Sequence, residues 1–167
     1  MTNDSKLSYL AGLFDGEGSF SLQALEREYK GTKWINFAPK MSMTLQEGNE
    51  ILDLLKKELG GSIYSYDNGK TRRWNLFTRE TCENATKILL PYLRIKKQIA
   101  KRFLKALSYF PKSRKSHSDH SRSWTAEMIR KVGMIAITLN PSTARRSKLK
   151  PQDIDRLSEV YERYDES

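Results

Sequence analysis

The sequence predicts an α+β fold built on one four-stranded antiparallel sheet, and three observations lead to this class. Two stretches, residues 19–46 and 62–78, alternate between apolar and polar side chains on both sides of a turn. A stretch with helical spacing precedes the first of them and follows each of them. Each predicted hairpin has one polar side. We therefore expect helices on one face of the sheet and an open polar face on the other.

The first element is a helix-like apolar run that ends in "FDGEG", and a hairpin around "KGTK" follows it. We expect Phe20, Leu22 and Ala24 on the outgoing strand to face the core, together with Phe37, Met41, Met43 and Leu45 on the return strand. The opposite face then carries Ser19, Ser21, Gln23, Leu25, Arg27, Asn36, Lys40, Ser42, Thr44 and Gln46.

The second half of the core repeats the helix and hairpin pattern. "GNEILDLLKKELGG" has helical spacing and closes on two glycines, a good C-terminal stop. Asn68-Gly69 then separates two runs rich in aromatic residues, which is a strong turn signal. The inward residues of this hairpin are predicted to be Ile63, Ser65, Trp74 and Leu76. The outward ones are Tyr64, Tyr66, Arg73 and Asn75.

The rest of the chain reads as helices in residues 80–93, 96–110, 124–139 and 152–164, with a polar, basic loop at 111–123. We interpret residues 1–167 as one domain, with an αββαββα core over about 1–110 and C-terminal helices over about 124–165. No apolar run is long enough to span a bilayer, so we expect a soluble, intracellular protein. Cys82 is the only cysteine, which excludes an internal disulfide.

The basic residues are concentrated in one part of the chain. The net charge is +10, and residues 94–150 carry 16 lysines and arginines against two acids. A segregated basic surface favours a nucleic-acid partner, because a polyanion releases counterions when it binds cations. The alternative is a basic surface that only keeps the protein soluble.

Asp15 and Glu17 come at the end of the first predicted helix, where the helix dipole disfavours acids. One explanation is a local hydrogen bond of Asp15, with glycines that merely end the helix. The other is that Ala11 and Gly12 leave a smooth patch where a second helix approaches closely, which would set the acids of two copies side by side. Adjacent carboxylates can hold hard divalent cations, which assist phosphodiester hydrolysis.

The stretch "LAGLFDGEG", residues 10–18, resembles the nine-residue signature of the LAGLIDADG homing endonucleases. The similarity extends to the αββαββα order, to "LQEGNEILDLLKKELGGSIY" and to "LLPYLRIKKQIAKRFL". This resemblance implies a saddle-shaped sheet lying in the DNA major groove, with the signature helices packed against each other. Because the motif occurs once, it implies a homodimer on a palindromic or nearly palindromic site, with Ala11, Gly12 and Asp15 at the interface and helix end. The resemblance also implies an intron-encoded protein.

The resemblance also assigns roles to single residues. It implies that Glu17 holds the metal with help from the Gly16 carbonyl, and that Gln46 organises water nearby. Lys96 matches a basic residue beside the attacked phosphate, although the adjacent Lys97 leaves the register open. The implied cofactor is Mg²⁺, with Mn²⁺ or Ca²⁺ as other occupants.

The predicted DNA contacts are the outward residues of the two hairpins. Gln23 and Arg73 are the best candidates for direct base readout, to adenine and guanine respectively. The full set is Ser19, Ser21, Gln23, Leu25, Arg27, Asn36, Lys40, Ser42, Tyr64, Tyr66, Arg73 and Asn75.

These observations predict a metal-dependent, site-specific endonuclease that cuts double-stranded DNA and leaves short 3′ overhangs. The alternative is a non-cleaving binder on the same scaffold, either an intron RNA maturase or a DNA-binding regulator. Glu17 favours the nuclease, because a pure binder has no need of an acid pointed at phosphates. His117 and His120 lack further ligands for a closed zinc site, so we interpret them as part of a basic loop.

Overall fold

The computed structural model describes residues 3–29, 31–46, 50–111, 124–139 and 150–165. The strands form one four-stranded sheet in the order β1-β2-β4-β3, and β4 is antiparallel to both of its neighbours. This confirms the predicted α+β class and the αββαββα order. The elements are α1 (Asn3–Glu17), β1 (Gly18–Tyr29), β2 (Thr32–Gln46), α2 (Glu50–Leu59), β3 (Ser62–Tyr66), the short 3-10 turn η1 (Asp67–Gly69), β4 (Thr71–Leu76), α3 (Arg79–Leu89), α4 (Lys97–Ser108), α5 (Ala126–Leu139) and α7 (Pro151–Asp165).

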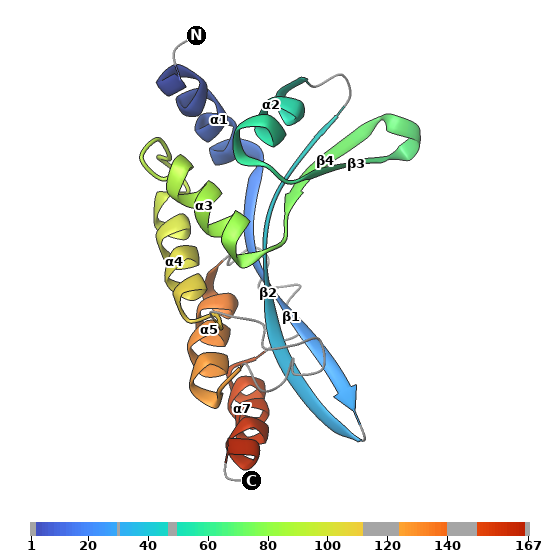
Figure 1. Ribbon diagram of the computed structural model, residues 1–167, viewed down its shortest axis with the longest axis vertical. Helices are drawn as coiled ribbons and strands as arrows, with labels where there is room; N and C mark the ends of the chain where they lie inside the picture. Colours follow the sequence, from blue (N-terminus) through green and yellow to red (C-terminus); the bar gives the residue numbers. More distant parts are fainter. Residues whose placement is uncertain (1–2, 30, 47–49, 112–123, 140–149, 166–167) are drawn as a thin grey trace. The chain divides into compact units, whose positions relative to one another are not determined.

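The chain packs as two compact units. Unit 1 comprises Met1–Ser21 and Pro39–Leu104, and unit 2 comprises Leu22–Ala38 and Lys105–Ser167. Strands β1 and β2 and helix α4 therefore each contribute residues to both units (Figure 1). The organisation of all 167 residues as a single domain stays a prediction.

In unit 1 the strand register separates an apolar face from a polar face. Trp74 pairs with Met43 on one side and with Ile63 on the other, and this row faces the helices. Helix α2 packs on β3 and β4, with its leucines buried at the predicted helical spacing. Ser65 was predicted to point inward and is exposed, because it lies near the tip of the hairpin at the edge of the sheet.

Helix α1 forms because Leu10, Ala11 and Phe14 share one buried face. It passes directly into β1, and the Phe14 ring lies edge-on to Phe20 with ring centroids 4.9 Å apart. A Cβ atom at Gly18 would come within 2.4 Å of the Phe14 ring. Glycine is therefore required where the helix turns into the strand.

The two predicted turns of the second helix-hairpin repeat are present. Gly60 and Gly61 end α2 with φ of 76° and 95°, values that favour glycine. The Gly60 carbonyl accepts a hydrogen bond from Trp74 Nε1 at 2.7 Å, which fixes the helix end to the sheet core. At the hairpin tip Asn68 has φ of 54°, as expected for an Asn-Gly turn.

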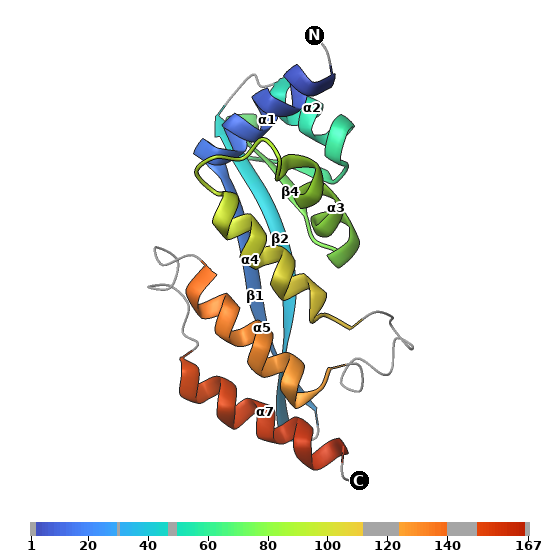
Figure 2. The same ribbon diagram turned by 90° about the vertical axis from the view of Figure 1, so that its left-hand side faces the viewer.

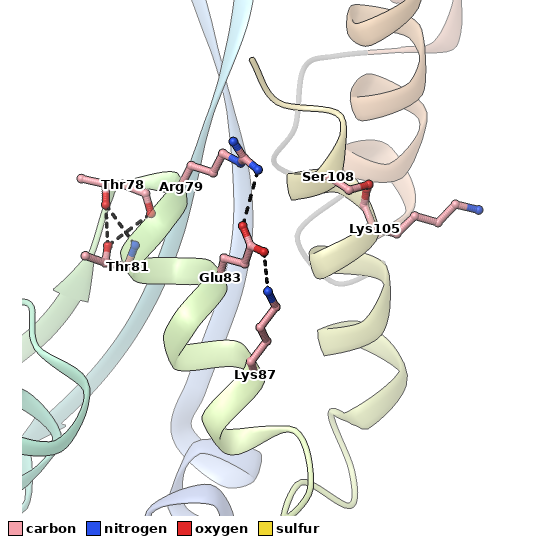
Figure 3. Close-up of polar contacts among 7 residues, drawn as sticks. All are labelled: Thr78, Arg79, Thr81, Glu83, Lys87, Lys105 and Ser108. Atoms are coloured by element: carbon pink, nitrogen blue, oxygen red, sulfur yellow. Dashed lines mark hydrogen bonds and ion pairs between the residues drawn. The ribbon is translucent and has the colours of Figure 1, made fainter. Parts of the chain in front are cut away.

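Helix α3 begins at a threonine cap and carries a short charge ladder (Figure 3). Thr78 Oγ1 accepts a hydrogen bond from the Thr81 amide at 3.2 Å. One turn later Glu83 forms ion pairs with both Arg79 and Lys87. These contacts fix α3 at the end of β4, where the chain leaves the sheet.

In unit 2, helices α5 and α7 lie side by side (Figure 2). The Tyr161 hydroxyl of α7 donates to the Ile35 carbonyl of β2 at 2.6 Å, and burial raises the pKa of Tyr161 to about 12. Trp124 packs against Phe37 and Phe110. Two predicted core residues of this unit are less buried than expected: Leu22 is half-buried and Ala24, toward the hairpin tip, is exposed.

Some sequence predictions fall on parts of the chain that the structure does not describe. His117, His120 and nearly all of the predicted 111–123 loop lie outside the described residues. Within the described ranges, no helix combines the length and apolar character needed to cross a membrane.

Candidate functional site

The two acids at the end of α1 lie in different surroundings. Asp15 is only 7 % exposed, whereas Glu17, the last residue of the helix, is exposed. The helix has no basic residue in its last turn, so the negative end of its dipole must be compensated from elsewhere. Asp15 therefore needs partners from another part of the chain, while Glu17 faces solvent.

Asp15 binds the segment that leads into α4. Its carboxylate accepts hydrogen bonds from the backbone amides of Arg94 at 2.7 Å, Ile95 at 3.1 Å and Lys96 at 2.8 Å. These three amides come just before α4, which begins at Lys97, so Asp15 fixes the turn that leads into this helix. The acid is supplied by a helix about eighty residues earlier in the sequence.

These hydrogen bonds keep Asp15 ionised despite its burial. Burial acts to raise the pKa of this carboxyl, but the amides of Arg94, Lys96 and Ile95 and the Lys96 charge outweigh it, so the pKa lies below the usual 3.8. One explanation that the sequence offered was a local hydrogen bond of Asp15. Asp15 does accept hydrogen bonds, but their donors are distant in the chain.

Lys96 supplies the positive charge that α1 itself lacks. Its ammonium donates to the carbonyl oxygens of Asp15 and, at 3.3 Å, of Gly16. Burial lowers the pKa of Lys96, and the charges of Asp15 and Glu17 act in the opposite direction. Of the two lysines that the sequence left open, Lys96 is the one held against the end of α1, whereas Lys97 is the first residue of α4. We call Asp15, Gly16, Glu17 and Lys96 the helix-end site.

The helix-end site offers oxygen donors but not a complete metal shell. Glu17 and the Gly16 carbonyl provide hard oxygen atoms, the ligands that Mg²⁺ and Ca²⁺ take. Gln46 is exposed at the last residue of β2, paired with Thr71 in the strand register. Among the residues that the structure describes, no three His, Cys, Asp or Glu side chains gather closely enough to hold a metal.

Small residues recur along the exposed side of α1, which also carries the exposed Tyr9. Ser8, Gly12 and Gly16 recur at intervals of four and are all exposed, and a Cβ atom at Gly12 or Gly16 would meet nothing within 4 Å. Nothing described in the chain therefore requires glycine at these positions. Ala11 was also predicted to lie at the interface. It is completely buried within its own chain, so it cannot form part of an exposed patch.

The polar face of unit 1 is an ordered array across three strands. The register aligns Ser42 with Asn75 and Ser62, and Thr44 with Arg73 and Tyr64. A third row aligns Gln46 with Thr71 and Tyr66. Eight of the predicted DNA contacts lie on strands of unit 1 on this face or beside it: Ser19, Ser21, Lys40, Ser42, Tyr64, Tyr66, Arg73 and Asn75.

Cations lie over aromatic rings on the polar face. The Arg73 guanidinium is 5.4 Å from the centroid of Tyr66, and its Nε donates to Thr44 Oγ1 at 2.8 Å. Lys40 Nζ is 5.5 Å from the centroid of Phe77. Burial, and then the nearby Arg73 charge, lower the pKa of Lys40. Both cations are thus held at the sheet surface rather than extended into solvent.

Two asparagines of the predicted contact set are less accessible than expected. Asn75 is only 2 % exposed, although its cross-strand partners Ser42 and Ser62 are small. Its Oδ1, like that of Asn36 in unit 2, is buried without a hydrogen-bond partner among the described residues. Ser19, Gln23 and Leu25 are exposed as predicted, and the side chain of Arg27 lies outside the described part of the structure.

One residue of this face was missed by the sequence reasoning. Phe77 directly follows β4, is 47 % exposed and carries the Lys40 ammonium. Extending the alternation of Arg73 and Asn75 by one further step would have placed it on the polar face. The predicted outward set of the second hairpin ended at Asn75, one step of the alternation before Phe77.

Comparison with known proteins agrees with this arrangement. Residues 10–110 match the family model described as LAGLIDADG endonuclease. Among solved structures, the homing endonuclease I-CvuI in complex with the I-CreI target has a TM-score of 0.71 and 17% identity, covering 95% of each chain. The archaeal intron-encoded homing endonuclease I-Vdi141I, complexed with DNA, has a TM-score of 0.68 and 18% identity, covering 99% of this chain and 100% of that chain.

A third solved structure matches this chain over only part of its own length. The LAGLIDADG meganuclease I-CpaMI, bound to uncleaved DNA, has a TM-score of 0.65 and 20% identity over 96% of this chain but 49% of its own. No curated protein sequence matched the chain.

Proposed function

The chain belongs to the LAGLIDADG endonuclease family, and from this premise we propose that it is a homodimeric, metal-dependent endonuclease that cuts both strands of a long, pseudo-palindromic DNA site. The cuts leave short 3′ overhangs. The observation that carries the proposal is the contrast between Asp15, which is buried and serves the fold, and Glu17, which is exposed beside it. An exposed acid at the negative end of a helix is unfavourable unless it binds something positive.

The polar face of unit 1 supports DNA as the substrate. Serine, threonine and arginine side chains are set in register across β2, β4 and β3, and a two-stranded β-ribbon fits the major groove. Arg73 is held by Thr44 and Tyr66, so its side chain would lose little conformational freedom when it binds DNA. The predicted contacts in unit 2, Gln23 and Leu25 among them, also bind DNA in this proposal.

At the helix-end site, Glu17 and the Gly16 carbonyl hold the divalent ion, Mg²⁺ in the first instance, and Gln46 orients water. The ion, when bound, makes water a nucleophile at neutral pH and offsets charge on the phosphate. Lys96 is fixed by the end of α1 and by the start of α4, so its ammonium can stabilise the negative charge that develops on the attacked phosphate.

Homodimerisation completes the site. The chain holds one copy of the signature motif, and I-CpaMI, which this chain matches over only 49% of its length, is about twice as long. Gly12 and Gly16 leave the face of α1 open to another helix, and two such helices can approach closely where side chains are absent. A second copy would bring its own Glu17 beside the first, and phosphate oxygens would add further hard ligands to those of the described residues.

The proposal is tested by a cleavage selection. Purified protein is incubated with Mg²⁺ and a large library of pseudo-palindromic duplexes, alongside Glu17→Gln, and the cut ends are sequenced. We expect staggered cuts in one long, roughly symmetric site, and none with Glu17→Gln. If both proteins enrich the same duplex and neither cuts it, the nuclease is excluded and the protein is a binder, for which RNA splicing assays are the next step.

A further inference from the structure

Phe77 is an exposed aromatic side chain at a position where the fold does not need one. Leu76 pairs with Met41 on the apolar face. Phe77 follows Leu76 and Lys40 precedes Met41, so alternation places both residues on the polar face. Leu76 is buried, whereas nearly half of the Phe77 surface is exposed. The phenyl ring therefore contributes less to the core than its size allows and is presented outward with Lys40.

The chemistry of Phe77 differs from that of the other exposed aromatic residues on this face. Tyr64 and Tyr66 are exposed to a similar extent, but each carries a hydroxyl that can donate or accept a hydrogen bond. Phe77 has no such group and can offer only apolar and ring-edge contacts. Lys40, held over the ring, has three donors and no acceptor.

These two side chains match one base edge in the major groove. Thymine presents an acceptor, O4, next to the C5-methyl group, which is the apolar feature of the groove. Cytosine presents an N4 amino donor instead and has no methyl group. A phenyl ring beside an ammonium complements thymine in both respects. With cytosine, the ring loses its apolar partner and the ammonium faces another donor.

We propose that Phe77 and Lys40 together read one thymine in each half-site, Phe77 through the C5-methyl group and Lys40 through O4. The inference rests on the proposed DNA-binding function and makes these two residues specificity determinants of it. Phe77 distinguishes thymine from bases without a methyl group and needs no hydrogen bond to do so. Lys40 favours a base that presents a hydrogen-bond acceptor over one that presents a donor.

The test uses duplexes of the selected site in which single bases are replaced. Each thymine is changed in turn to uracil, which removes only the methyl group, in symmetric pairs across the two half-sites. At the position found, 5-methylcytosine and cytosine opposite guanine form a second methyl comparison. Binding is measured by fluorescence anisotropy in EDTA, so that affinity is scored without cleavage.

We expect uracil at one position to weaken binding of the wild-type protein by about fourfold per half-site, the effect of burying one methyl group. Phe77→Ala should abolish that penalty, and Phe77→Leu should retain part of it. Lys40→Met should reduce the preference for thymine over 5-methylcytosine and leave the uracil penalty in place. Tyr66→Ala, a matched aromatic control on the same face, should weaken binding without altering the uracil penalty.

A uracil scan with no penalty at any position, a penalty that persists in Phe77→Ala, or a selected site without thymine would each overturn this inference. These results are distinct from failure of the proposed function. If the proposed DNA binding fails, the wild-type protein enriches no duplex at all and the scan has no starting site. If only the proposed cleavage fails, a duplex is enriched but uncut, and the uracil scan on it still tests Phe77 and Lys40.

Discussion

The helix-end site and the polar face of unit 1 are both rich in charge, but they hold it in different ways. At the helix-end site, Asp15 and Lys96 bind backbone amides and carbonyls. On the polar face, Arg73 and Lys40 bind other side chains: a threonine hydroxyl and two aromatic rings. Backbone groups stay in place whatever the sequence, whereas side-chain partners change with each substitution. The comparison teaches that the proposed chemistry is tied to the fold, while specificity is free to vary.

The largest expected effect comes from removing the cation at the helix-end site. Lys96→Met should lower kcat for DNA cleavage by about 10²–10³-fold, because a fixed positive group near the attacked phosphate is lost. Affinity for the target duplex should change far less. Lys97→Met is the neighbouring control and should retain most of the activity, measured by single-turnover cleavage. Equal losses in both variants would mean that Lys96 acts only through general surface charge.

Asp15→Asn tests whether the buried acid serves stability. It should lower the free energy of unfolding by about 2–3 kcal/mol near neutral pH, because three charge-assisted hydrogen bonds to the start of α4 are weakened. The control Glu17→Gln should leave stability nearly unchanged, since Glu17 is exposed. Urea denaturation followed by circular dichroism measures both.

The same variant makes a pH prediction. The pKa of Asp15 is lower in the folded protein than its ordinary value of 3.8, so its ionised form stabilises the fold at any pH above 3.8. That contribution is lost as the pH falls through the folded-state pKa. The stability difference between wild type and Asp15→Asn should therefore be constant above about pH 5 and shrink below pH 3.8. A difference that grows in acid would contradict this assignment.

Adjacent arginines on β4 test the polar face. Arg73→Ala should weaken DNA binding by about 1–3 kcal/mol and relax the preference at one half-site position. Arg72 pairs with Leu45 on the other face and forms a two-pronged ion pair with Asp53 of α2, so Arg72→Ala should leave that preference intact. Binding assays on single-base variants of the site distinguish them. Uniform weakening of all sequences by Arg73→Ala would mean a phosphate contact.

The smallest expected effect on folding is that of Gly12→Ala. No atom within 4 Å opposes a Cβ there, so the variant should fold at least as stably, with a gain of up to about 1 kcal/mol from helix propensity. Its homodimer should nevertheless dissociate more readily in analytical ultracentrifugation. Gly18→Ala is the contrasting change, since it collides with the Phe14 ring and should destabilise the chain itself. If the Gly12→Ala dimer dissociates no more readily than the wild-type dimer, α1 does not form the dimer interface.

The order of the elements could be predicted from the sequence because each had a local signal. Alternation located the strands, and the turn glycines located the ends of the hairpins and of α2. Burial at particular positions was harder to predict. Asn75 follows the outward alternation as predicted, yet it is buried, although its partners on β2 and β3, Ser42 and Ser62, are small. Periodicity gives the face that a residue belongs to, but not how far its side chain is exposed on that face.

The candidate site, too, could be predicted from the sequence only in part. The motif identified the residues Asp15, Glu17 and Lys96, but the partners of Asp15 are backbone amides, and backbone amides have no sequence signal. Ala11 was misplaced because adjacent helical residues differ in direction by about 100°, so a neighbour of Gly12 need not share its exposure. Phe77 was missed because the predicted outward set of the second hairpin ended at Asn75, one step of the alternation before it.

The bond between Asp15 and the start of α4 joins residues 79 to 81 positions apart. During synthesis, the acidic end of α1 therefore leaves the ribosome well before Lys96 is made, and it cannot acquire its cation until most of unit 1 has been translated. A contact this distant in sequence closes late in folding. A nascent or truncated chain that ends before residue 94 has the acids but neither the amides nor the ammonium, and such an intermediate should leave the DNA of its host uncut.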